Sequence, residues 1–218
     1  MTKGNGAIQP LSGVKVLDFT QVMMGPCATQ MLADYGADVI KIERPGVGDL
    51  SRTSIADDPD GLNNPVFRSL NRNKRSIALD LRGEAGKAVV YDLVKTADVV
   101  VNNFRAGVMD RMGFGYEQLA RINPRIICAF GSGFGQSGPF AHKGGQDILA
   151  QAVSGVMARK PDKALPTTLY STALADYSAG MHMVQGILLA LMQREKTGVG
   201  QAISVSLYDS MLAMQMQE

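Results

Sequence analysis

Short runs of apolar residues alternate with longer amphipathic segments along this 218-residue chain. The runs mostly lack a polar residue at every second position, which is typical of strands buried on both faces of a parallel sheet. We predict strands at 14–19, 37–43, 76–81, 98–104, 125–130 and 200–207.

The segments between these strands repeat apolar residues every three or four positions and predict helices. Pro26 suits the first position of a helix running to about Tyr35, because an N–H there would have no partner. Residues 44–70, rich in Pro and Gly, are expected to be irregular. Alternating strands and helices predict an α/β fold: a parallel sheet with helices on both faces and right-handed crossovers. Further helices are expected at 84–97, 116–122, 146–157, from about Tyr177 onward and at 208–218.

Composition excludes several classes of protein. A net charge of +2 and the absence of Trp argue against nucleic-acid binding. The most apolar stretch, Met181–Met192, is shorter than a membrane span and predicts a core helix. Cys27 and Cys128 have no metal-ligand spacing, and we expect them to be free thiols in a reducing cytoplasm; no metal site is predicted. The polar N-terminus does not resemble a signal peptide.

Asp176 is a lone acid ahead of a long apolar run. One interpretation makes it the N-cap of the helix from Tyr177, contributing about 1 kcal/mol. The other makes it a nucleophile, held ionised by the positive end of the helix dipole. Spacing alone favours the cap.

Glycines follow the predicted strand 125–130 in the pattern G-x-G-x-x-G, at Gly133, Gly135 and Gly138. Pro139 follows at once, and no acid-bearing strand comes about 20 residues later, so a dinucleotide site is disfavoured. We expect a loop beside an active site instead, with backbone N–H groups available to an oxyanion.

Basic residues gather near predicted strand ends: Arg44, Lys74, Arg75, Arg105 and Arg111. Such loops bind ligands in doubly wound sheets, and Arg and Lys suit phosphates. They predict either a shared anion site or ordinary surface charge, and Lys74 and Arg75 precede their strand rather than follow it.

Four segments together resemble the class III coenzyme A transferases, with the formyl-CoA transferase branch nearest and α-methylacyl-CoA racemases as relatives. They are LSGVKVLDFTQVMMGPCATQMLADYGADVIKIERPGVGD, NRNKRSIALDL, ADVVVNNFRAGVMDRMGFGYEQLARINPRII and ADYSAGMHMVQGILLALMQREKTGVGQ. The resemblance implies a Rossmann-like large domain, of which residues 1–218 are the N-terminal part, with the small domain and a C-terminal return segment absent from this chain. It further implies an interlocked homodimer when full length.

The resemblance also implies a reaction and a site. CoA passes from an acyl-CoA donor to a small carboxylic acid through anhydride and aspartyl-CoA thioester intermediates on Asp176, with CoA thioester as substrate and no permanently bound cofactor. The residues implied to contact CoA are Met23, Met24, Arg44, Asn71, Asn73, Lys74, Arg75, Asn103, Phe104, Arg111 and Met112.

Two positions depart from the family. Racemases carry a histidine where Gln146 stands, and glutamine cannot accept a proton, so racemisation is disfavoured. Formyl-CoA transferases carry a glutamine where Met23 stands and a tyrosine at Gln146. The Met23–Met24 pair predicts an apolar, adaptable wall and points away from oxalate. An acyl-CoA racemase or epimerase and a non-catalytic CoA-binding fragment remain the alternatives.

Overall fold

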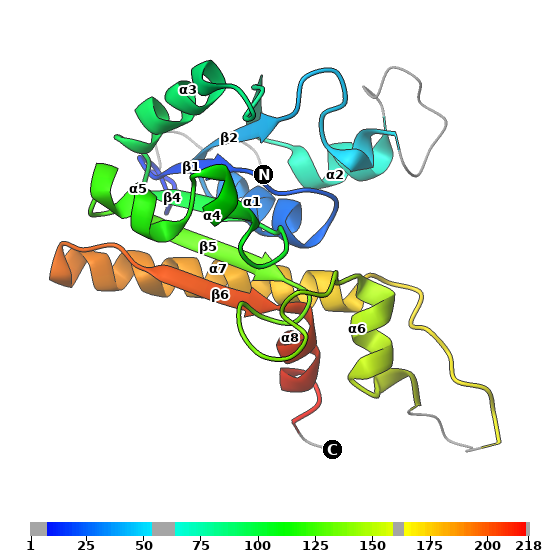
Figure 1. Cartoon of the computed structure of the whole chain (residues 1–218). Helices are drawn as coiled ribbons and strands as arrows, with labels where there is room; N and C mark the ends of the chain where they lie inside the picture. The colour runs from blue at the N-terminus through cyan, green and yellow to red at the C-terminus, as the bar shows by residue number, and fades with distance from the viewer. Residues whose placement is uncertain (1–7, 54–63, 159–163, 217–218) are drawn as a thin grey trace.

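A six-stranded, all-parallel sheet forms the centre of the computed structural model, which describes residues 8–53, 64–158 and 164–216 (Figure 1). The strand order is β3-β2-β1-β4-β5-β6, so the chain builds outward from β1 and then returns to build on its other side. The loops that follow β1 and β4 therefore diverge at the carboxyl edge of the sheet, which is where open α/β sheets bind ligands. The strands are β1 (Lys15–Asp18), β2 (Asp38–Glu43), β3 (Lys74–Ala78), β4 (Val99–Asn102), β5 (Ile127–Ser132) and β6 (Ala202–Ser206).

Helices cover both faces of this sheet, as the apolar strands require. Val99 and Val101 of β4 belong to one buried cluster, with helices α1 (Met24–Asp34) and α7 (Leu174–Thr197), while Val100 belongs to the other. That second cluster contains side chains of α3 (Glu84–Val94) and α5 (Tyr116–Ile122). The predicted α/β fold with helices on both faces is confirmed.

The long helix α7 packs directly on α1. A side chain added at Gly180 would place its Cβ 3.1 Å from the backbone oxygen of Met24, so the missing side chain permits this close approach. Met183 and Ile187 of α7 are fully buried, and each such side chain contributes about 1.5–3 kcal/mol. The predicted core helix is therefore confirmed.

Shorter elements complete the described residues. They are the helices α2 (Pro65–Asn71), α4 (Val108–Met112), α6 (Asp147–Val153) and α8 (Leu207–Ala213) and the 3₁₀ turns η1 (Leu50–Arg52) and η2 (Val156–Ala158). No helix in residues 8–53, 64–158 or 164–216 combines the length and hydrophobicity needed to cross a membrane.

The structure corrects several predicted boundaries. Helix α2 occupies the end of the stretch expected to be irregular; Asn64 caps it and Pro65 begins it, a start signal that the surrounding Gly and Pro residues obscured. Strand β3 begins at Lys74, so Lys74 and Arg75 lie in the strand rather than before it. Residues 54–63 of the expected irregular stretch lie outside the described residues.

Candidate active site

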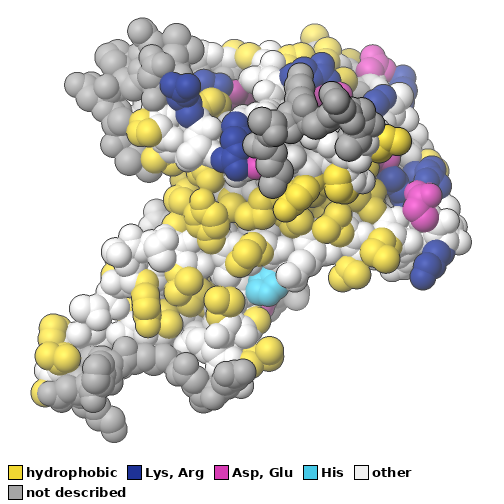
Figure 2. Space-filling view, turned by 180° about the vertical axis from the view of Figure 1, so that it is seen from behind, with side chains coloured by type: hydrophobic (Ala, Val, Ile, Leu, Met, Phe, Trp, Pro, Cys, Tyr) yellow, Lys and Arg dark blue, Asp and Glu magenta, His cyan; other side chains and the backbone are white. Residues whose placement is uncertain are grey.

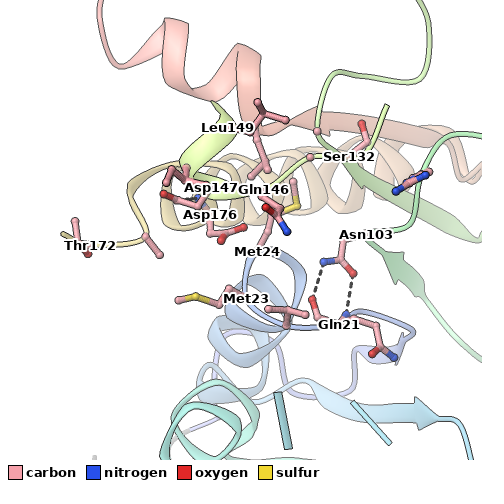
Figure 3. A pocket seen from close by; sticks show the side chains of 18 of the residues that line it. Gln21, Met23, Met24, Asn103, Ser132, Gln146, Asp147, Leu149, Thr172 and Asp176 are labelled. Carbon is pink, nitrogen blue, oxygen red and sulfur yellow. Dashed lines mark hydrogen bonds between the residues drawn. The ribbon is translucent and has the colours of Figure 1, made fainter. Parts of the chain in front are cut away.

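A cavity of about 940 Å³ opens at the carboxyl edge of the sheet (Figure 3). The loops after β1, β4 and β5 form one side, and α6, the start of α7 and the segment before α7 form the other. The residues lining it are Gln21, Val22, Met23, Met24, Asn103, Phe104, Arg105, Ser132, Gly133, Gly144, Gly145, Gln146, Asp147, Ile148, Leu149, Leu169, Tyr170, Ser171, Thr172, Ala173, Asp176 and Leu207.

Asp176 lies in this cavity but does not cap its helix. Helix α7 begins at Leu174, so Asp176 is its third residue, and the N-cap, Ala173, has no side chain able to cap. The predicted N-cap role of Asp176 is therefore wrong. Its half-buried carboxylate instead lies near the backbone N–H of Met24, at the start of α1, and this N–H lowers the pKa of Asp176.

Asp147 caps α7 in place of Asp176. One carboxylate oxygen of Asp147 accepts the backbone N–H of Asp176 at 2.9 Å, and the other accepts the Gln151 side-chain amide at 2.5 Å. Because Asp147, from α6, supplies the acceptor that the helix start needs, the carboxylate of Asp176 is released to face the cavity.

The two carboxylates also determine the charge of the site. Burial, and next the negative charge of Asp147, raise the pKa of Asp176 to about 7, while the nearby backbone N–H of Met24 acts in the opposite direction. The sequence predicted that the helix dipole keeps Asp176 ionised. Burial and the charge of Asp147, which both favour the protonated form, could not be seen in the sequence. Asp176 is therefore not permanently charged at neutral pH.

Asn103, which follows β4, holds the loop after β1. Its side-chain oxygen accepts the Gln21 N–H at 2.8 Å, and its side-chain nitrogen donates to the Gln21 carbonyl at 2.7 Å (Figure 3). The pair of bonds joins two loops on the same side of the cavity. Met23 and Met24 follow directly and line the same wall, next to the acid.

The glycine loop contributes its backbone to packing. A Cβ at Gly133 would lie 2.5 Å from the Cα of Gly145, so the two glycines allow two loops to touch. The N–H of Gly135 already donates to the hydroxyl of Ser132 at 2.9 Å, and Gly135 does not line the cavity. The exposed Gln146 lines the cavity one residue before Asp147.

The structure thus brings together some of the predicted CoA contacts, Met23, Met24, Asn103 and Phe104, with Asp176. The remaining ones lie outside the cavity wall: Arg44, Asn71, Asn73, Lys74, Arg75, Arg111 and Met112.

Several of these outer residues have protein partners. Lys74 is buried and donates to Asp18 at 3.0 Å, and burial lowers its pKa to about 8 despite that partner. Arg75 is exposed and pairs with Asp38 at 2.7 Å. Arg44 and Arg111 are exposed. CoA contacts by these residues stay predictions.

Two residues in the cavity were absent from the predicted substrate contacts. Arg105 is the one Lys or Arg among the described lining residues, and its guanidinium lies against Gly144. The sequence placed it in a basic cluster without distinguishing it from Arg111. Asp147 had no signal of its own, since its proximity to Asp176 arises from the packing of α6 on α7.

Comparisons with known proteins agree on one family. The sequence profile of CoA-transferase family III matches residues 11–218. The chain is 45% identical over 203 residues to formyl-CoA:oxalate CoA-transferases of Escherichia coli and Shigella boydii, covering 93% of this chain and 49% of each relative. It therefore spans about half the length of the curated relatives it matches.

Solved structures share the fold of this chain. A CAIB/BAIF family protein from Brucella suis superposes with a TM-score of 0.91 and 38% identity, over 97% of this chain and 56% of that one. A hypothetical protein from Mycobacterium tuberculosis gives a TM-score of 0.87 and 35% identity, over 96% and 57%.

Proposed function

The chain belongs to CoA-transferase family III, and we propose that it transfers CoA from an acyl-CoA to a carboxylic acid with Asp176 as the nucleophile. The observation that carries this proposal is the Asp176 carboxylate itself: free of any capping role, it lies in the cavity against the Met24 N–H. Because Asp147 accepts the backbone N–H at the start of α7, the Asp176 carboxylate is available to react with a substrate in the cavity.

The proposed chemistry uses two attacks on carbonyl carbon for each half reaction. A carboxylate oxygen of Asp176 attacks the thioester carbon of acyl-CoA; the C–S bond breaks, and CoA leaves as thiolate, giving a mixed anhydride. The thiolate then attacks the Asp176 carbonyl, which releases the donor acid and leaves an aspartyl-CoA thioester. The acceptor carboxylate repeats these steps in the opposite sense and restores Asp176.

Two features of the cavity support this sequence of steps. The Met24 N–H is a donor able to stabilise negative charge that develops at the Asp176 carboxyl. Arg105 is the cation within the described lining and suits a phosphate or carboxylate of the substrates. Since only the ionised acid attacks, we expect the first step to speed up as the pH rises through about 7.

Racemisation finds less support. Proton removal at an α-carbon needs a base beside the acid, and the residue at the corresponding position of the cavity is Gln146. The apolar wall of Met23 and Met24 supports acyl groups less polar than oxalate.

The wider context of the chain is proposed from the family resemblance. We propose that residues 1–218 are the N-terminal part of the large domain of a longer protein that forms an interlocked homodimer. A cytoplasmic location is proposed from the two buried free thiols, Cys27 and Cys128, which suit a reducing compartment.

Trapping the intermediate tests the proposed nucleophile. The chain is incubated with an acyl-CoA and hydroxylamine, which converts an anhydride or thioester of Asp176 into a hydroxamate that peptide mass spectrometry detects. We expect the adduct on Asp176 in the parent and none in Asp176→Asn.

Glu117→Gln is the matched control, because Glu117 is also an acid in the first turn of a helix but does not line the cavity. It should give the same adduct as the parent. Acyl-CoA binding without any adduct would instead identify a CoA-binding fragment, and solvent deuterium entering the α-carbon would identify a racemase.

A further inference from the structure

Residues 20–22, between β1 and α1, are held mainly by side chains. At Thr20, the second residue after β1, the buried carboxylate of Asp18 accepts the backbone N–H at 2.8 Å. The buried ammonium of Lys41, from the neighbouring strand β2, donates to the Thr20 carbonyl at 2.7 Å. Both polar groups of this peptide unit are therefore satisfied by charged side chains out of contact with water.

The next two residues are held in the same way. Asn103 binds both backbone groups of Gln21, and a carboxylate oxygen of Asp49 accepts the backbone N–H of Val22 at 3.1 Å. The other oxygen of Asp49 pairs with Lys41 at 2.8 Å, and both side chains are almost completely buried. The Lys41–Asp49 ion pair and the side chain of Asn103 thus form a cage around residues 20–22, each bound to a different part of this backbone.

This cage encloses a strained conformation. Val22 has φ of +67°, in the left-handed region that a β-branched residue rarely adopts. Such a conformation persists only where the surroundings over-determine it, and it is found mainly at functional sites. The exposed side chain of Val22 gains little from packing in return.

The strained residue lies two positions before Met24, with only Met23 between them. The backbone N–H of Met24 acts on the Asp176 carboxylate and lowers its pKa. Met24 also begins α1, so its N–H has no partner within the helix. The direction of that N–H follows from the dihedral angles of residues 20–23.

We propose that Lys41, Asp49 and Asn103 are positioning residues: together they hold the strained turn at Val22 and so aim the Met24 N–H at the Asp176 carboxylate. The catalytic meaning of this arrangement rests on the proposed function, whereas the arrangement itself does not. Two ionisable groups interact with Asp176: Asp147 from α6 raises the pKa of Asp176, and Asp176 in turn raises the pKa of the Cys27 thiol from α1.

An NMR titration of the labelled chain, without any substrate, tests the proposal. In the parent, the Met24 amide shift should follow the ionisation of Asp176, with a midpoint near pH 7. Asn103→Ala should remove most of this Met24 response and raise the Asp176 midpoint, because the carboxylate loses a donor that stabilises its charged form.

Asn123→Ala is the matched control. Asn123 is half-buried like Asn103 and binds three backbone groups, but in the loop before β5, away from the cavity. Its replacement should leave the Met24 response and the Asp176 midpoint unchanged. A Met24 response that persists in folded Asn103→Ala would overturn the proposal.

A second variant serves if Asn103→Ala does not fold. The Lys41→Met, Asp49→Asn double variant leaves no unpaired buried charge, so it keeps the fold more readily than either single change. It should weaken the Met24 response, and an undiminished response contradicts the role of the pair. Failure of hydroxylamine trapping in the parent would contradict the proposed function. It would not affect the titration results, which are obtained without substrate.

Discussion

The two sides of the cavity are built in different ways. On the β1 side, residues 20–22 are held by the buried side chains of Asp18, Lys41 and Asp49 together with Asn103. On the other side, residues 164–172 are exposed before they enter α7. Their contacts include the buried Gln151, which accepts the Tyr170 N–H at 3.1 Å and donates to the Thr172 carbonyl at 3.3 Å.

The difference indicates that the β1 side of the cavity is rigid, whereas the side formed by residues 164–172 is able to open locally. The β1 side combines buried charges with backbone strain, which suits a donor that must stay in one position while charge develops on its partner. The exposed side has few buried contacts, which is typical of segments that open locally at low cost. Asp176 lies where the two meet, with its backbone held by Asp147 and its carboxylate facing Met24.

A further apolar surface lies away from the cavity. Figure 2 shows hydrophobic side chains gathered in a band across the face opposite to that of Figure 1. The exposed hydrophobic residues of α7 include Met181, Leu188, Leu189 and Met192. Exposed apolar surface of this kind is typical of interaction surfaces.

Lys41→Met should give the largest effect, because it breaks the cage of the β1 side. The change leaves Asp49 buried without its cation, which costs about 3–5 kcal/mol of the free energy of unfolding. Urea denaturation measures the loss. Arg75→Met, which breaks the exposed pair with Asp38, should cost at most about 1 kcal/mol. If Lys41→Met and Arg75→Met lose equal free energies of unfolding, the buried Lys41–Asp49 pair stabilises the protein no more than an exposed ion pair does.

Asp176→Asn should have the next largest effect, and only at higher pH. A carboxyl with a pKa raised from 3.8 to about 7 contributes stability that is complete below pH 4 and is lost as the pH rises to 7. The variant should therefore exceed the parent by about 2 to 4 kcal/mol in free energy of unfolding at pH 8. The difference should nearly vanish at pH 4, and a difference independent of pH would contradict the raised pKa.

Among the variants in the cavity wall and its supports, Gln151→Leu should have the smallest effect, on the exposed side of the cavity. Loss of the bonds to Tyr170 and Thr172 at similar side-chain volume should cost about 1–2 kcal/mol. Hydrogen exchange should accelerate at 168–173 and stay unchanged at 20–24. Equal acceleration in both segments would show that the two sides unfold as one unit.

Much of the fold could be predicted because it is encoded in short-range patterns. Val99, Val100 and Val101 are all apolar because β4 is buried on both faces, and that requirement is visible without coordinates. Asp176 also stood out, as a lone acid ahead of the apolar run of α7. The start of α2 was equally encoded, by Asn64 and Pro65, but was obscured by neighbouring turn residues.

The charge state and partners of Asp176 could not be predicted in this way. Asp147 lies 29 positions earlier in the chain, and Met24 and Asn103 lie farther still, so no local spacing relates them to the acid. The strain at Val22 likewise exists only because Asp49 and Asn103 reach it from other loops. Periodicity along a chain records which faces are buried, whereas the approach of distant polar groups depends on how those faces pack. Burial and the neighbouring carboxylate that set the pKa of Asp176 are properties of that packing.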